Sequence, residues 1–195
     1  EWHQKLSYSV HHYVEDVIQT SDGDYIVVGG AGGDPLGGHA VKGKAFILRM
    51  SEGGGVQWIK HYGIYDTPNN TFWGVVEADD GGFVLAGEKL QDRNFEFYDH
   101  FWVMKTDAYG DEEWSIKSGG NLWDEAQDIV KLSDDSYIVT GKTSSSSTNL
   151  NMKVMRVSSS GQILWQNNHG GGNNDTATGI TLSQNEEMVA IVGYT

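Results

Sequence analysis

The sequence predicts an all-β fold, a β-propeller built from four-stranded antiparallel blades, and three observations support it. The 195 residues include 26 glycines and only 2 prolines, and 38% of them are hydrophobic. Short alternating apolar runs are separated by turns rich in Gly, Asp and Ser, which is typical of antiparallel hairpins. Two phrases also recur along the chain at regular distances, as repeat architectures require. We expect one domain of about four repeats, covering 2–58, 59–114, 115–165 and 166–195.

The first phrase ends in tryptophan. "FILRMSEGGGVQW" (46–58), "WVMKTDAYGDEEW" (102–114) and "KVMRVSSSGQILW" (153–165) align without a gap. Each consists of an apolar stretch with one basic residue, a turn with glycine, and a short run closing on Trp58, Trp114 or Trp165. We assign these phrases to the third and fourth strands of a blade, and Trp2 to the last strand of a preceding, truncated unit.

The second phrase ends in glycine and occurs four times: "VIQTSDGDYIVVG", "VVEADDGGFVLAG", "IVKLSDDSYIVTG" and "ITLSQNEEMVAIVG". Its Asp-Gly segment predicts a tight turn, because Asp bonds its own backbone and Gly accepts positive φ. The final glycine suits a crowded inner position or a bulge. The same acids could instead form a calcium loop, although the distal Glu of an EF-hand is absent. We expect turn chemistry and no cofactor, with calcium as the alternative.

Four-stranded units of this length are best buried by radial stacking, because an open sheet of so many strands would expose its edges. A β-solenoid is the second choice. The sequence predicts three complete blades and two strands of a fourth. Residues 1–6 could close a ring of four beside 180–195; otherwise the blades belong to a longer propeller, or copies of the chain associate. Because the chain begins with Glu-Trp, we expect a processed or trimmed polypeptide.

Charge and composition exclude several functions. The net charge of −14 disfavours nucleic acids and anionic membranes as partners. The absence of cysteine excludes thiolate catalysis and Cys-based zinc sites. No stretch approaches the ~20 apolar residues of a membrane helix. No nucleophile elbow, zinc-protease, P-loop or Rossmann motif occurs. We therefore expect a protein that is not an enzyme.

The repeat resembles a family of tandem repeats in secreted and surface proteins of bacteria and archaea. "WIKHYG" (58–63), "DDGGFVLAG" (79–87) and "FWVMKTDAYGDEEW" (101–114) are similar to its W-x-K-x-Y-G-G, D-G-G-Y-I-V-A-G and K-x-D-x-x-G-x-x-x-W motifs. The resemblance covers nearly the whole chain, but "SQNEE" replaces Asp-Gly in the fourth unit. It implies a propeller and an extracellular or cell-surface setting, and it implies no catalytic residues.

The long, variable connections should all lie at one end of the blades. They are the segments between second and third strands (30–44, 88–100, 142–151) and the links between units (59–72, 115–124, 166–176). Variable loops on a rigid scaffold commonly carry binding residues. These segments collect aromatic, acidic and histidine side chains, Asp99 and His100 among them, and the candidate ligand-binding residues are His12, Tyr13, Tyr65, Asp66, Trp73, Tyr98, Trp123, Asp124, His169 and Asp175.

The candidate acids have alternative interpretations. Asp66, Asp124 and Asp175 fall at near-equivalent places, where they could line a central mouth and hold a cation, or could cap the start of an inner strand. Trp73 and Trp123 could equally pack between blades. His11 and His12 are adjacent and would point to opposite faces of a strand, which disfavours a shared zinc ion.

Three functions remain. The first is an extracellular recognition module that binds a glycan or a protein through the face formed by the long connections. The second is a structural subunit whose open blade edges pair chains into a ring or fibre. The third is a hydrolase that uses central acids, which would require paired carboxylates with one raised pKa.

Overall fold

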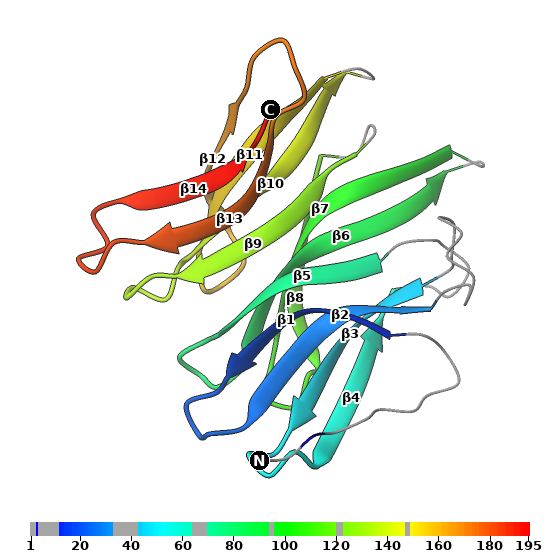
Figure 1. Ribbon diagram of the computed structural model, residues 1–195, viewed down its shortest axis with the longest axis vertical. Coiled ribbons are helices and arrows are strands. Elements are labelled where there is room, and N and C mark those ends of the chain that lie inside the picture. Colours follow the sequence, from blue (N-terminus) through cyan, green and yellow to red (C-terminus); the bar gives the residue numbers. More distant parts are fainter. Residues whose placement is uncertain are drawn as a thin grey trace.

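The computed structural model describes residue 3 and residues 12–32, 43–63, 70–93, 96–119, 123–146 and 149–195. It contains 14 antiparallel strands in four sheets of four, four, four and two strands, and no helix occurs in these ranges. It follows that none of these residues forms a helix long and apolar enough to cross a membrane. The sheets follow one another in chain order, with β1–β4 and β13–β14 at opposite ends of the series (Figure 1).

Each sheet is a simple meander in which consecutive strands pair. The first contains β1 (His12–Gln19), β2 (Tyr25–Gly32), β3 (Gly43–Met50) and β4 (Val56–Tyr62), and the second contains β5 (Asn70–Glu77), β6 (Phe83–Arg93), β7 (Glu96–Thr106) and β8 (Glu112–Ser118). The third contains β9 (Glu125–Lys131), β10 (Tyr137–Ser146), β11 (Asn149–Val157) and β12 (Ile163–His169), and the last contains β13 (Thr176–Leu182) and β14 (Val189–Tyr194).

This arrangement confirms the prediction of an all-β fold with three complete four-stranded units and two strands of a fourth. Two predicted loops are wrong. Most of segment 88–100 extends β6 and β7, with pairing as far as Arg93 and Glu96. Most of segment 142–151 likewise extends β10 and β11, from Lys142–Met152 to Ser146–Asn149. The antiparallel ladder continues through these polar residues because each strand satisfies the backbone groups of the other. Segments 33–42 and 1–11, apart from His3, lie outside the described residues.

The glycine that ends the second repeated phrase stands where the backbones approach too closely for a side chain. A Cβ atom on Gly29, Gly87, Gly141 or Gly193 would lie 1.8–2.1 Å from a carbonyl oxygen of the first strand of the same sheet. Each of these pairs of strands also has a register shift at that point, the mark of a bulge. The prediction of a crowded or bulged position is confirmed.

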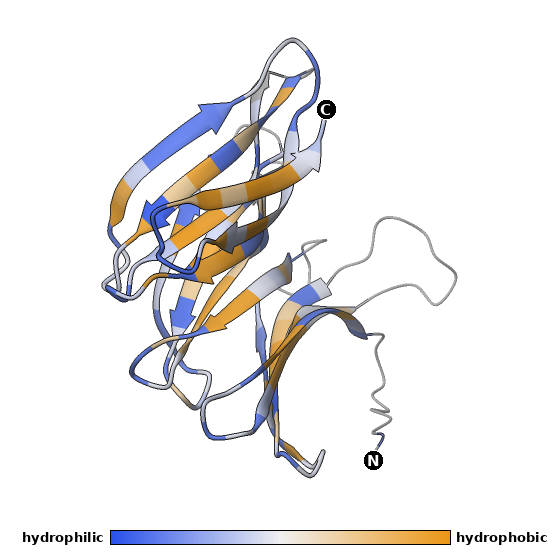
Figure 2. Ribbon diagram, turned by 60° about the vertical axis from the view of Figure 1, so that its left-hand side comes forward, coloured by the Kyte–Doolittle hydropathy of each residue, from blue (hydrophilic) through white to orange (hydrophobic). Residues whose placement is uncertain are grey.

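Most of the core lies between consecutive sheets, and one further cluster, which includes Phe46 and Leu48, is buried on the face of the first sheet that turns away from the second. One cluster joins the first and second sheets and includes Val28, Ile47, Val75 and Trp102. A second cluster joins the second and third sheets, and a third joins the third and fourth. Figure 2 shows the same pattern, with hydrophobic residues along the strands and hydrophilic residues at the turns. The neighbouring sheets therefore protect one another from water.

The repeated tryptophans link each sheet to the next. A Cβ on Gly110, in the β7–β8 turn, would lie 3.0 Å from the ring of Trp58, and one on Gly161, in the β11–β12 turn, 2.8 Å from Trp114. The Trp114 indole N–H also donates to the Ser159 carbonyl at 3.0 Å. Both turn glycines have positive φ. The fourth sheet has only two strands and so lacks the turn that would cover Trp165. The Trp165 ring is accordingly 39% exposed.

This difference predicts unequal costs for two identical substitutions. Trp114→Ala should lower the free energy of unfolding by about 2 kcal/mol or more, because it removes contacts with the next sheet. Trp165→Ala should cost less than about 1 kcal/mol, because that ring has no such partner. Urea unfolding followed by circular dichroism measures both. Equal costs would contradict the assignment of the tryptophans to sheet-to-sheet contacts.

Candidate functional site

A pocket of about 610 Å³ opens between the first three sheets, at the end where the sequence predicted the long connections. Its walls combine exposed rings with carboxylates. Trp123 is 59% exposed and Tyr13 is 53% exposed, whereas Trp73 is half-buried. The lining residues come from β1, β2, β5, β6, β7, β9 and the link before β9; they are Tyr13, Glu15, Gly30, Thr71, Trp73, Glu88, Asp99, Trp123 and Glu125.

Repeat-equivalent positions converge on this pocket. The register with the crowded glycines makes Tyr13, Thr71 and Glu125 the same position in three successive first strands. Gly30 and Glu88 are likewise equivalent, since each directly follows the crowded glycine of its sheet. Because the backbone is alike in each unit, differences in these side chains give the pocket its chemical character.

Three carboxylates gather on one wall. Glu88 and Asp99 are on adjacent strands of the second sheet, and because Glu88 pairs with Phe101 and Asp99 with Leu90, they are diagonal neighbours on one face. Glu125 approaches from the third sheet. One oxygen from each carboxylate can be chosen so that all three lie within 4.8 Å of one another.

Burial and mutual repulsion perturb the titration of this group. Loss of solvation, followed by repulsion from Glu125 and Asp99, raises the pKa of Glu88 to about 9. Loss of solvation and the charge of Glu125 also raise the pKa of Asp99 to about 7. Lys142 opposes part of this effect, because its ammonium forms an ion pair with Glu125 at 2.7 Å. Glu125 also accepts a hydrogen bond from the Gln127 amide at 2.8 Å.

The structure brings together only some of the residues that the sequence singled out. Tyr13, Trp73 and Trp123 line the pocket. His12 instead packs edge-to-face on Phe46, with ring centroids 5.1 Å apart. His169 is exposed at the end of β12 and does not line the pocket. Tyr65, Asp66 and the side chain of Tyr98 lie outside the described part of the chain.

Asp124 and Asp175 form hydrogen bonds close to the start of β9 and β13 and do not line the pocket. Asp124 is 1% exposed and accepts a hydrogen bond from the Thr143 hydroxyl. Asp175 accepts the amide of Gly171 at 2.8 Å. A Cβ on Gly119 or Gly170 would collide with one of these carboxylates, so glycine is needed beside each.

Of the two interpretations that the sequence allowed, the geometry of Asp175 fits the capping role because it accepts a backbone amide, whereas Asp124 binds the side chain of Thr143. Their equivalent in the second sheet is Asn70, beside Gly63, rather than Asp66.

Sequence reasoning passed over Glu15, Glu88 and Glu125 as site residues. The available signal was the position after the crowded glycine, which is Gly30, Glu88, Lys142 and Tyr194 in the four units. A lone acid inside the apolar run "FVLAGEKL" is unusual for a strand buried on both faces. Thr71 carries no such signal.

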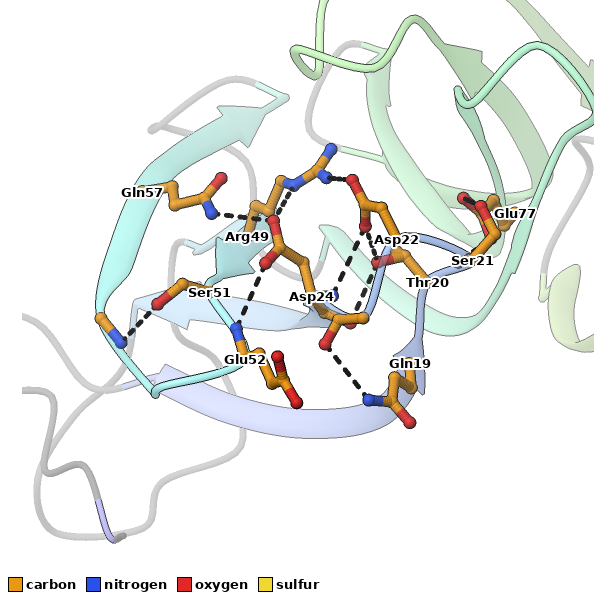
Figure 3. Close-up of polar contacts among 12 residues, drawn as sticks. Gln19, Thr20, Ser21, Asp22, Asp24, Arg49, Ser51, Glu52, Gln57 and Glu77 are labelled. Carbon is orange, nitrogen blue, oxygen red and sulfur yellow. Dashed lines mark hydrogen bonds and ion pairs between the residues drawn. The ribbon is translucent and has the colours of Figure 1, made fainter.

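The Asp-Gly turns form a separate, structural set of polar contacts. In the first turn Asp22 and Asp24 both bind Arg49, at 2.5 and 3.0 Å, and the Gln57 amide donates to Asp24 (Figure 3). The same acid-to-base pair recurs as Asp80–Lys105 and Asp134–Arg156.

The conformation of these turns agrees with their sequence. Gly23 and Gly81 have φ of 93° and 79°, which confirms the predicted turn chemistry. These carboxylates already bind a basic side chain of their own sheet, which disfavours the calcium loop considered from the sequence. The basic residue in each tryptophan phrase thus has a structural role.

The raised pKa of Glu88 predicts that stability falls with pH. A carboxyl whose folded pKa exceeds its unfolded value stabilises the fold while protonated, and this contribution is lost as pH rises from about 4.5 toward about 9. In metal-free buffer, Glu88→Gln should therefore flatten the decline in the midpoint of urea unfolding between these limits. The exposed Glu52→Gln is the matched control. A decline as steep in Glu88→Gln as in the control would contradict the buried, raised-pKa state.

Comparison with known proteins adds little to this description. No family model and no curated protein matches the sequence. Similar solved structures include a protein of unknown function from Bacteroides caccae, which is 14% identical with a TM-score of 0.49. The alignment covers 98% of this chain and 64% of that protein, so the chain spans less than two thirds of its length.

Proposed function

We propose that the chain is an extracellular β-propeller recognition module that binds a glycan in the pocket between its first three sheets. The observation that carries the proposal is the meeting of repeat-equivalent residues at one pocket. In a propeller the first strand of each blade lines the central axis. Tyr13, Thr71 and Glu125, which occupy the same position of three first strands, all border the pocket. The extracellular setting rests on the resemblance of the repeats.

The chemistry of the pocket favours a sugar. Flat rings such as those of Trp123 and Tyr13 can stack on the apolar face of a pyranose, while adjacent carboxylates accept hydrogen bonds from its hydroxyls. The volume of about 610 Å³ lies within the range of small-molecule sites. Because the surface carries a net charge of −14, a neutral or cationic ligand is favoured over an anionic one. A concave site of this size suits a short glycan better than a flat protein surface.

Binding should depend on the exposed rings. A glycan array followed by isothermal titration with the best ligand should give a dissociation constant that rises at least about tenfold in Trp123→Ala, because one stacking contact is lost. Tyr109→Ala removes a more accessible ring, 71% exposed, in the β7–β8 turn, and should leave affinity unchanged. Absence of any glycan ligand, or equal losses in both variants, would contradict the proposal.

A second function, assembly of chains through open sheet faces, is supported by exposed apolar residues at the two ends of the series. Val192 of β14 is 65% exposed, although its equivalents Val28 and Ala86 are fully buried. Val17 of β1 is 56% exposed, whereas the equivalent Val75 is 3% exposed. Inside the chain, Val28 of the first sheet and Val75 of the second belong to one buried cluster between these sheets. The exposed parts of the last and first sheets therefore match as the two halves of a repeated interface, although Phe46 and Leu48, on the same face as Val17, are already buried within the chain.

Head-to-tail association of this kind predicts that molar mass rises with concentration in size-exclusion chromatography with light scattering. Val192→Asp should abolish the rise, because a charge would be buried at the contact. Tyr109→Asp, on a hairpin turn away from both faces, is the control. A mass equal to one chain at every concentration tested would exclude assembly.

A further inference from the structure

The pocket wall formed by Glu88, Asp99 and Glu125 has the composition of a cation site. All three donors are carboxylates, they come from two different sheets, and their nearest oxygens lie within 4.8 Å of one another. Acidic residues are abundant in this chain, so their clustering alone has no functional meaning. The burial and hydrogen bonding of the individual groups decide the question.

Glu88 is buried without a hydrogen-bond donor. It is 7% exposed, it faces the pocket, and no described residue donates a hydrogen bond to its carboxylate or forms an ion pair with it. Oδ1 of Asp99 is also buried without a partner. Asp99 Oδ1 has no contact with water, and folded proteins rarely leave such an atom unsatisfied, because removing it from water costs free energy that no bond returns.

Other buried acids of this chain are satisfied by the protein itself. Asp124 accepts from Thr143 and Asp175 from Gly171. The half-buried Asp128 accepts two backbone amides, those of Ile129 and Ile180, at 2.8 and 2.9 Å. The absence of donors at Glu88 is therefore not a general property of the fold.

The local charge matches a divalent ion. Three carboxylates meet at the wall, and Lys142 neutralises one of them through its ion pair with Glu125. When Glu88 and Asp99 are both ionised, their two negative charges equal the charge of one Ca²⁺ or Mg²⁺, so binding of the ion is coupled to loss of their protons. Binding of a divalent ion would remove the repulsion among the acids and satisfy the unpartnered oxygens.

We propose that Glu88, Asp99 and Glu125 bind a calcium ion at the wall of the pocket. Oxygen-only donors select hard cations. Calcium accepts six to eight oxygen ligands at about 2.3–2.6 Å in a flexible geometry, whereas magnesium demands a near-ideal octahedron at about 2.0–2.1 Å. Three carboxylates on two separate sheets, with oxygens within 4.8 Å of one another, are therefore better suited to calcium, with water completing the shell. If the proposed glycan binding is correct, sugar hydroxyls can replace that water.

The test uses the metal alone, so that it stands apart from any glycan. After treatment with EDTA, isothermal titration with Ca²⁺ should show one saturable site per chain, with a dissociation constant of about 10⁻⁶–10⁻³ M. Tb³⁺, which replaces Ca²⁺, should luminesce on excitation of tryptophan, because Trp73 and Trp123 line the same pocket. Added Ca²⁺ should displace this signal.

Variants assign the site to these residues. Glu88→Gln and Asp99→Asn keep the side-chain shape and should each weaken Ca²⁺ binding at least about tenfold. Glu52→Gln removes the same charge on an exposed turn and should change nothing. If circular dichroism shows that Glu88→Gln does not fold, the Ca²⁺ affinity of Asp99→Asn decides whether the site is assigned to these residues.

No saturable binding by either method would overturn the proposal, as would affinity that falls equally in Glu52→Gln. Tighter binding of Mg²⁺ than of Ca²⁺ would overturn the assignment to calcium.

Discussion

The structure depends on one constraint: the sheets are apolar on both faces, and most of this apolar surface is protected from water by a neighbouring sheet. Within a sheet the strands approach so closely that Gly29, Gly87, Gly141 and Gly193 admit no side chain. That close approach accompanies a bulge in each first strand. Between sheets, Asp16 uses the bulge region to accept the amide of Val75 at 3.0 Å. Asp128 does the same for Ile180 of the fourth sheet. In both cases an aspartate of one sheet accepts a backbone amide of the next sheet along the chain, so hydrogen bonds join the same pairs of sheets as the apolar contacts do.

Function, in this account, arises where the repeats diverge. The positions that face neighbouring sheets stay apolar, whereas the position after the crowded glycine changes from Gly30 to Glu88 to Lys142. Because the backbone places these residues alike, a change of side chain alters charge without altering the scaffold. An acidic wall can therefore be built into the pocket at little structural cost, apart from the desolvation of Glu88. A bound cation would offset that desolvation.

Much of the fold could be predicted from the sequence, because each position can be compared with the equivalent positions of the other repeats. The turns at Gly23 and Gly81, the crowded glycines and the four units follow from local chemistry that recurs. The length of β6 and β10 could not be predicted, because polar residues such as those of 143–146 form either loops or strand ends, and only the partner strand decides. The pocket was predicted in part: its face and three of its aromatic residues were recognised. The acidic wall was missed because Glu88 and Glu125 lie 37 residues apart and meet only through sheet packing.

Native-state hydrogen exchange at low protein concentration tests the mutual protection of the sheets most directly. Opening free energies should be highest in β6 and β7, which lie in the second sheet, where full neighbouring sheets cover both faces. They should be lowest in β14, where Val192 is exposed although the equivalent residues of the first two sheets are buried. Such a gradient from the middle of the series toward β14 is the result expected here. Amides of β14 protected as strongly as those of β6 would show that a sheet needs no neighbour, and would contradict the account.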